Sequence, residues 1–70
     1  MQIIFDGPRH IVTSYGNGDA YLVRRNETGE EFFVQGDDAT AFYSDIFDQD
    51  AFDFSEAIEN LYGDEFYPNS

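Results

Sequence analysis

The hydrophobic pattern of the chain changes its period at Gly36, and this change restricts the possible folds more than any other feature. Before Gly36, short runs of β-branched and aromatic residues alternate with turns rich in glycine and asparagine, which is typical of antiparallel strands. After Gly36, apolar residues recur at intervals of three and four, the spacing of an amphipathic helix. The sequence therefore predicts an α+β fold in which a β meander precedes two helices.

Three segments of the first half predict strands: residues 10–15 (HIVTSY), 19–25 (DAYLVRR) and 30–35 (EEFFVQ). The Gly16-Asn17-Gly18 run between the first two tolerates positive φ angles and predicts a hairpin turn, and residues 26–29 (NETG) predict a second turn. We therefore expect a three-stranded antiparallel sheet. Residues 1–5 could add a short N-terminal strand, ended by the turn at Gly7-Pro8.

Two apolar stripes predict the two helices. The first stripe consists of Ala39, Phe42, Tyr43, Ile46 and Phe47, and the second of Phe54, Ala57, Ile58, Leu61 and Tyr62. Since a helix must bury its apolar stripe, we expect both helices to pack on one face of the meander.

Residues with capping chemistry mark the helix ends. Asp37 is the expected N-cap of the first helix, and Asp53 with Glu56 resembles an acidic capping box at the start of the second. Gly63 stands where a left-handed C-terminal cap belongs. These limits divide one small domain, residues 1–70, into a sheet (1–36), two acidic helices (37–63) and a frayed tail (64–70), from which Phe66 and Tyr67 could dock.

The size and cysteine content restrict how this domain is stabilised. A chain of 70 residues builds only a modest core, and the absence of cysteine leaves packing, with thirteen aromatic residues, as the source of stability. No apolar run is long enough to span a bilayer, and the first ten residues lack the features of a signal peptide. We expect a cytoplasmic protein.

The charge is large and unevenly distributed. Fifteen acidic residues, three arginines and no lysine give a net charge of −12, whereas a net charge of roughly 2 to 8 in magnitude suffices for a small soluble domain. Residues 1–36 carry five acids and three arginines, a net charge of −2, while residues 37–70 carry ten acids and no base. A disordered chain is excluded by the aromatic content of 19%.

The segment from Asp45 to Glu56, DIFDQDAFDFSE, begins and ends with acids as a calcium-binding loop does. An EF-hand loop needs oxygen ligands at positions 1, 3, 5 and 12 and glycine at position 6. A loop starting at Asp45 would have Phe47 at position 3, and one starting at Asp48 would have Phe52 at position 5 and Asp53 at position 6. We therefore expect no specific metal site and no cofactor.

Signatures of catalysis are also missing. The single histidine, His10, lies in a predicted strand, where a structural role is the usual one. There is no cysteine nucleophile, and the serines at positions 14, 44, 55 and 70 lack a nucleophile-elbow motif. Paired carboxylates are abundant, but acid–base catalysis needs environments that separate two pKa values, and these acids look uniformly exposed. We expect that the protein is not an enzyme.

The acids of the second half instead form a predicted surface. Helical spacing places them opposite the apolar stripes and continues the row through the connection and beyond the second helix. Their expected role is to contact a basic partner, to which Tyr62 or Tyr67 could add an anchor. The predicted contact residues are Asp38, Asp45, Asp48, Asp50, Asp53, Glu56, Glu59, Asp64 and Glu65.

Three explanations of this surface can be compared. A merely solvated helical face does not account for 34 consecutive residues without a base. Adaptation to high salt predicts acids spread over the whole chain. Mimicry of nucleic acid fits best, because carboxylates on a rigid scaffold can occupy a basic groove that evolved for phosphates.

In size, lysine-free acidity, absent cysteine and β-then-α layout, with the acids in GDDATAFYSDIFDQD and onward, the chain resembles the small acidic inhibitors encoded by phages and mobile elements. These include anti-CRISPR and anti-restriction proteins that mimic DNA. The resemblance implies a stoichiometric blocker, active in the host cytoplasm, that occludes the nucleic-acid channel of a defence complex without binding nucleic acid or membranes itself. A CRISPR effector is the first choice of target, since its channels hold nucleic acid by the backbone, and a restriction enzyme is the second.

Two other classes stay open, as does the oligomeric state. An acidic adaptor or antitoxin would use the same surface to bind one basic protein without mimicry. A steric or allosteric inhibitor would use the mildly basic sheet, where Arg9, Arg24 and Arg25 lie. A role for these arginines in offsetting Glu30 and Glu31 across the hairpin is the simpler expectation.

Overall fold

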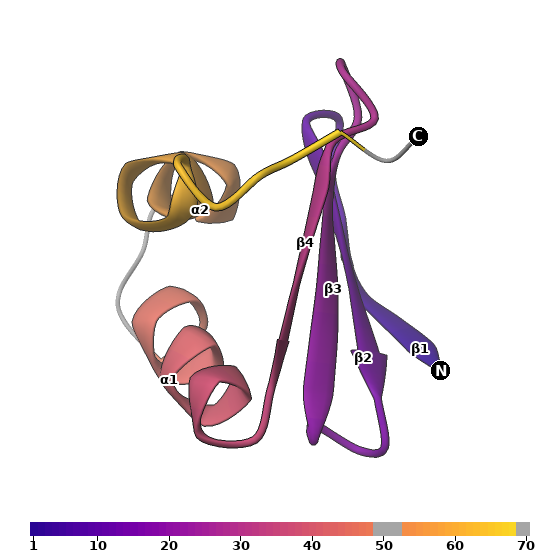
Figure 1. Ribbon diagram of the computed structural model, residues 1–70, viewed down its shortest axis with the longest axis vertical. Coiled ribbons are helices and arrows are strands. Elements are labelled where there is room, and N and C mark those ends of the chain that lie inside the picture. The colour runs from indigo at the N-terminus through magenta and orange to yellow at the C-terminus, as the bar shows by residue number, and fades with distance from the viewer. Residues whose placement is uncertain (49–52, 69–70) are drawn as a thin grey trace.

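The computed structural model describes residues 1–48 and 53–68 and has an α+β fold in two layers, an antiparallel sheet and a pair of helices (Figure 1). The helices cover one face of the sheet, and the other face is left open. In chain order the elements are β1 (Gln2–Asp6), β2 (His10–Tyr15), β3 (Ala20–Arg25), β4 (Glu31–Gln35), α1 (Asp37–Ile46) and α2 (Phe54–Tyr62).

The sheet has four strands in the order β1-β2-β3-β4, each antiparallel to its neighbour. The predicted three-stranded meander is confirmed, and the possible N-terminal strand is formed as β1. Strand β1 pairs with β2, and the register of this pairing shifts between Ile3 and Phe5. The β2–β3 hairpin turns where the sequence predicts, with positive φ angles at Gly16, Asn17 and Gly18 of 61°, 57° and 99°.

The core lies between the sheet and the helices. Strand alternation turns Val12, Val23 and Phe32 toward the helices, because these residues are paired across β2, β3 and β4. The helices contribute the inward residues of their stripes. The buried core cluster contains Val12, Tyr21, Val23, Phe32, Ala39, Phe42, Ile46 and Ile58.

Aromatic rings join the two layers of this core. Phe32 of β4 stacks on Tyr62 with ring centroids 5.5 Å apart and makes edge contacts with Phe42 at 5.9 Å and Phe66 at 4.8 Å. At the far side of the sheet, Phe5 of β1 meets Phe54 edge-on at 5.4 Å. Such pairs stabilise beyond the apolar area that they bury, so the aromatic residues bring rigidity to a domain of this size.

Two residues of the predicted stripes lie at the surface. Tyr43 is 42% exposed and Leu61 is 59% exposed. Ser55, which the stripe omits, is buried at 3% exposure. The inward face of α2 is therefore rotated toward Ser55 relative to the prediction.

The predicted helix caps are correct in one case of three. Asp53 caps α2, accepting hydrogen bonds from the backbone N–H groups of Ser55 and Glu56 at 2.9 and 3.3 Å. The prediction of Asp37 as a cap is wrong: Gly36 occupies that position, without a side-chain cap, and Asp37 is the first residue of α1.

The prediction of a left-handed cap at Gly63 is also wrong, because the residue is right-handed, with φ −56° and ψ −29°. Glycine is needed there for another reason. A Cβ atom at Gly63 would lie 2.4 Å from the carbonyl oxygen of Glu59, closer than real Cβ contacts come. The backbone therefore approaches α2 where only glycine fits.

The tail is docked, so the expectation of fraying is wrong for residues 64–68. Tyr67 exchanges two backbone hydrogen bonds with Glu31, of 3.1 and 3.2 Å. The Phe66 ring packs against the core and lies under the guanidinium of Arg25, 4.0 Å from ring centroid to Cζ. Residues 69–70 of the predicted tail lie outside the described part of the chain.

Candidate functional site

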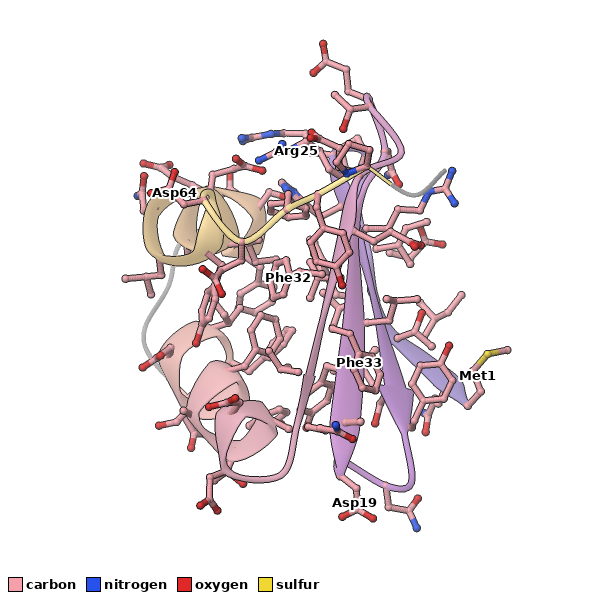
Figure 2. All side chains as sticks on the ribbon, viewed as in Figure 1. Met1, Asp19, Arg25, Phe32, Phe33 and Asp64 are labelled. Atoms are coloured by element: carbon pink, nitrogen blue, oxygen red, sulfur yellow. The ribbon has the colours of Figure 1, made fainter. Side chains whose placement is uncertain are left out.

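Seven carboxylates of the predicted contact set are exposed on the helical half of the molecule. Figure 2 shows such carboxylates projecting from the helix layer, with Asp64 labelled at α2. Asp50, also in the predicted set, lies outside the described residues. We call the following residues the acidic face: Asp38, Asp45, Asp48, Asp53, Glu56, Asp64 and Glu65.

The hydroxyl of Tyr62 organises one part of the acidic face. It donates a hydrogen bond of 2.9 Å to Oδ2 of Asp45, joining α2 to α1. Burial raises the pKa of Tyr62 to about 12, assisted by the hydrogen bond to Asp45 and by the negative charges of Asp45, Asp38 and Glu65. Three carboxylates from α1 and the tail thus act on the same hydroxyl, so the fold brings them together.

A second part of the acidic face flanks the connection between the helices. Asp48 follows α1, Asp53 caps α2, and Glu56 lies in the first turn of α2. Asp53 and Glu56 also have a structural reason to be acidic, since negative charge at a helix N-terminus is stabilising. The side chains of Asp48 and Glu56 make no hydrogen bond or ion pair to other described residues, so their carboxylates are available to a partner.

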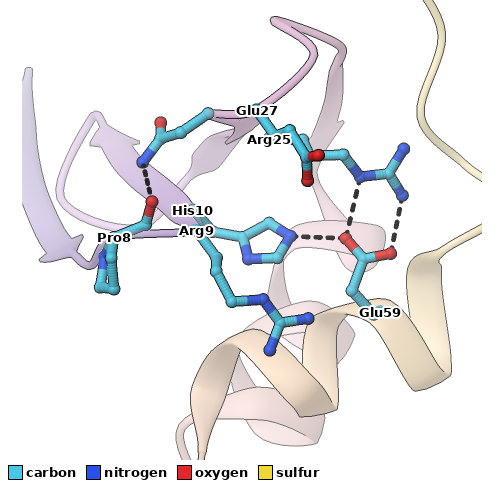
Figure 3. Close-up of a pocket in the computed structure, with 7 residues that line it drawn as sticks. Pro8, Arg9, His10, Arg25, Glu27 and Glu59 are labelled. Atoms are coloured by element: carbon cyan, nitrogen blue, oxygen red, sulfur yellow. Dashed lines mark hydrogen bonds and ion pairs between the residues drawn. The ribbon is translucent and has the colours of Figure 1, made fainter.

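Glu59 does not belong to the acidic face, contrary to the prediction. Its Oε2 accepts hydrogen bonds from Nε2 of His10 at 2.6 Å and Nε of Arg25 at 3.0 Å, and its Oε1 accepts one from Arg25 at 2.7 Å (Figure 3). Both carboxylate oxygens are occupied by donors from the sheet. We call Glu59, Arg25 and His10 the clamp, because they tie α2 to β2 and β3.

The electrostatics of the clamp favour the charged forms of Glu59 and Arg25. The hydrogen bonds from Arg25 are the main cause that holds the pKa of Glu59 below its usual value, with a contribution from His10, while burial opposes them. The same hydrogen bond with Glu59 raises the pKa of Arg25. Arg25 also donates to Glu30 at 2.6 Å, as expected for an offset across the hairpin.

An open cavity of about 590 Å³ lies beside the clamp, as Figure 3 shows. Its lining contains no hydroxyl, thiol or amine nucleophile; it consists of Pro8, Arg9, His10, Arg25, Asn26, Glu27 and Glu59. The charge of the Glu59 carboxylate is balanced by Arg25, and both of its oxygens accept hydrogen bonds. The clamp is therefore arranged for structural support of α2. Within residues 1–48 and 53–68, no group of three or more histidine or acidic side chains is arranged to hold a metal ion.

Comparison with known proteins gave no match to a family model, to a curated sequence or to a solved structure. In the described part of the chain, neither helix has the length and hydrophobicity needed to cross a membrane.

The inward position of Glu59 escaped the sequence analysis. Glu59 and Glu56 are three residues apart, so helical spacing assigned both to the outer face. The available signal was the hairpin register, which pairs His10 with Arg25 and places two potential donors side by side on the helix-facing side of the sheet. Such a pair calls for an acceptor from the covering helix, and Glu59 supplies it.

Proposed function

We propose that the protein is a stoichiometric inhibitor that presents carboxylates to a basic nucleic-acid channel in place of phosphates. The observation that carries the proposal is the exposure of the acidic face on a half of the chain that contains no base, residues 37–70. Because the Cα atoms extend over 26 Å, a duplex of the same length offers about 15 phosphate charges. The chain has a net charge of −12, so its charge per length is of the same order as that of DNA.

Rigid support of the charges is the second requirement for mimicry. A basic channel that holds nucleic acid by its backbone recognises a fixed spacing of negative charge. Three acids of the acidic face lie on α1 and α2, and the other four lie just beyond the ends of these helices. The aromatic core and the Tyr62–Asp45 hydrogen bond join the two helices to each other. Preorganised charges lose little entropy when they bind. The favoured target is an RNA-guided CRISPR effector, with a restriction enzyme second.

The test uses two triple variants with equal charge. The first changes the acidic face (Asp38→Asn, Asp48→Asn, Glu56→Gln), and the matched control changes exposed acids of the sheet half (Asp6→Asn, Asp19→Asn, Glu27→Gln). Asp45 and Glu59 are left intact because both make internal hydrogen bonds. Any difference between the variants therefore reports the position of the charge, since the net charge is the same.

The measurement is displacement of a labelled target duplex from a panel of purified guide-loaded CRISPR effectors and restriction enzymes. We expect the wild-type protein to displace duplex at one equivalent, the acidic-face variant to lose at least tenfold in potency, and the control to lose less than threefold. Equal losses in both variants would show that only net charge matters. Failure to displace duplex from any complex would refute mimicry for these targets.

The second candidate function, an acidic adaptor or antitoxin, would use the same acidic face. It differs from a mimic in whether added nucleic acid competes with it for the partner. An adaptor bound to a basic protein outside its nucleic-acid site is indifferent to added duplex DNA or guide-like RNA. A mimic is displaced by both, and its affinity falls steeply with salt.

A further inference from the structure

The open face of the sheet is apolar in its middle and nearly neutral in charge. Strand register arranges the residues that point away from the helices in three rows across the sheet. The middle row is Ile3, Thr13, Leu22 and Phe33, one end row is Asp6, Ile11, Arg24 and Glu31, and the other end row is Tyr15, Ala20 and Gln35. We call these residues the open face.

Large apolar side chains on the open face are exposed. Ile3 is 55% exposed and Phe33 is 46% exposed, and the rings of Phe33 and Tyr15 lie 6.4 Å apart across the sheet (Figure 2). The solvent-exposed face of an antiparallel sheet ordinarily consists of polar residues, whereas here the middle row has a single polar member, Thr13. An exposed apolar patch of this kind marks an interaction surface.

We infer that the open face binds the open face of a second copy of this chain, forming a twofold dimer of packed sheets. The inference is independent of the proposed function, because it uses the layer opposite the acidic face. Charge identifies the occupant. The open face carries only Asp6, Arg24 and Glu31 among its charged residues, a net charge of −1 in a protein of −12. It is therefore the side on which two such anionic molecules repel least.

The distribution of charge within the open face also selects the orientation. If the two sheets packed with their charged rows together, Asp6 and Glu31 of one copy would meet the same acids of the other. If the strands run in opposite directions, the charged row of each copy lies over the uncharged row with Tyr15 and Gln35. This orientation also brings Arg24 of each copy toward the hairpin of the other, where Asp19 is exposed. A twofold axis across the strands satisfies both conditions.

Distances make the remaining repulsion tolerable. Packed sheets lie about 10 Å apart, and the helices, which carry or flank the acidic face, lie behind the sheet of each copy. They are thus separated by more than the Debye length of about 8 Å at physiological salt. Raising the salt concentration should strengthen the dimer, whereas it weakens the binding of a mimic to a basic channel. Failure of one proposal is therefore distinguishable from failure of the other.

The size of the open face sets the expected affinity. Four strands about 4.8 Å apart and five residues long cover roughly 300 Å² per copy in projection. The total of about 600 Å² is below the roughly 1,200–2,000 Å² of stable specific interfaces and belongs to weak, transient ones. We therefore expect a weak dimer that forms and dissociates rapidly and is populated only at high protein concentration.

Sedimentation velocity over a concentration series tests the dimer at low and high salt. We expect the mass to double with concentration, at lower concentrations in high salt. Phe33→Gln should raise the dissociation constant at least tenfold, and the matched control Leu61→Gln, which removes an exposed apolar residue from α2, should leave it unchanged. A monomer up to millimolar concentration overturns the inference, as does an equal effect of the two variants.

A second measurement does not depend on how Phe33→Gln folds. In the proposed orientation each residue of the middle row lies opposite its own copy, so Thr13→Cys should be joined into a covalent dimer by a short bis-maleimide. The chain has no other cysteine. Thr40→Cys, on exposed α1, should stay monomeric under the same conditions. Equal cross-linking at both positions contradicts the proposed interface.

Discussion

At the scale of single residues, Glu59 is an acid of the helical half that stabilises the fold, because it binds donors from the sheet. Its side chain is 28% exposed, yet it accepts hydrogen bonds from Arg25 and His10. Glutamine keeps only one of the two oxygens, so Glu59→Gln turns an amide NH2 toward a donor of Arg25 or of His10, which is buried at 1% exposure. An unmade buried hydrogen bond is expensive.

Glu59→Gln should therefore lower the free energy of unfolding by about 1–3 kcal/mol. Glu65→Gln is the same change at an exposed position, where the side chain makes no hydrogen bond to the described residues, and should alter it by less than about 0.5 kcal/mol. Urea denaturation followed by circular dichroism measures both. Equal stabilities of the two variants would argue against the clamp.

The clamp also has a pH dependence whose direction is fixed. Since the pKa of Glu59 is lowered in the folded state, the unfolded state binds more protons, and the contribution of Glu59 is lost as the pH falls below the unfolded value of about 4.3. The stability difference between wild type and Glu59→Gln should be full at neutral pH and shrink below that value. A difference that is constant from neutral to acidic pH would exclude an ionised clamp.

Tyr62 gives a prediction at the opposite end of the pH scale. Its pKa is raised to about 12, so its contribution to stability is present below the unfolded pKa near 10 and is lost as the pH rises through that range. Asp45→Asn should bring the pKa of Tyr62 down toward its ordinary value, because it removes the charged acceptor. The titration of the Tyr62 ring can be followed by NMR. An unchanged pKa of Tyr62 in Asp45→Asn would contradict a contribution from Asp45 and leave burial, with the charges of Asp38 and Glu65, as the cause.

At the scale of elements, the sequence was sufficient where local chemistry decides the structure. The meander, the hairpin at Gly16-Asn17-Gly18, both helices and the Asp53 cap follow from turn residues, hydrophobic period and capping groups. Docking of Phe66 and Tyr67 was left open, but the pairing of Tyr67 with Glu31, the conformation of Gly63 and the position of Glu59 did not follow. Contacts between distant segments determine these features. The candidate site was likewise predictable as a row of acids. The sequence did not indicate that Glu59 binds the sheet and is not part of this row.

The two aspartates at the helix starts provide a matched pair. Asp53→Ala removes a side-chain cap and should lower the free energy of unfolding by about 1 kcal/mol. Asp37→Ala removes an acid that makes no cap and should lower the free energy of unfolding by no more than about 0.3 kcal/mol. Thermal denaturation of the two variants distinguishes them. A larger loss in Asp37→Ala would mean that the start of α1 is misassigned.

At the scale of the whole molecule, the net charge of −12 opposes the compact state. Because salt screens this repulsion, the melting temperature should rise by several degrees between low and physiological ionic strength. The triple variants Asp38→Asn, Asp48→Asn, Glu56→Gln and Asp6→Asn, Asp19→Asn, Glu27→Gln should show a smaller rise. Differential scanning calorimetry over a salt series measures it, and a melting temperature that falls with salt would contradict net repulsion.

The clamp has a consequence for how the two halves of the chain depend on each other. Residues 37–70 have no base of their own, so Arg25 of the sheet serves α2 as an immobile counterion, and His10 adds a hydrogen bond. A substitution at Arg25 would release Glu59 and so add one negative charge to the surface while it loosens the helix that carries it. A change at this single arginine of the sheet would therefore strengthen the negative charge of the helical half and at the same time weaken the support of α2.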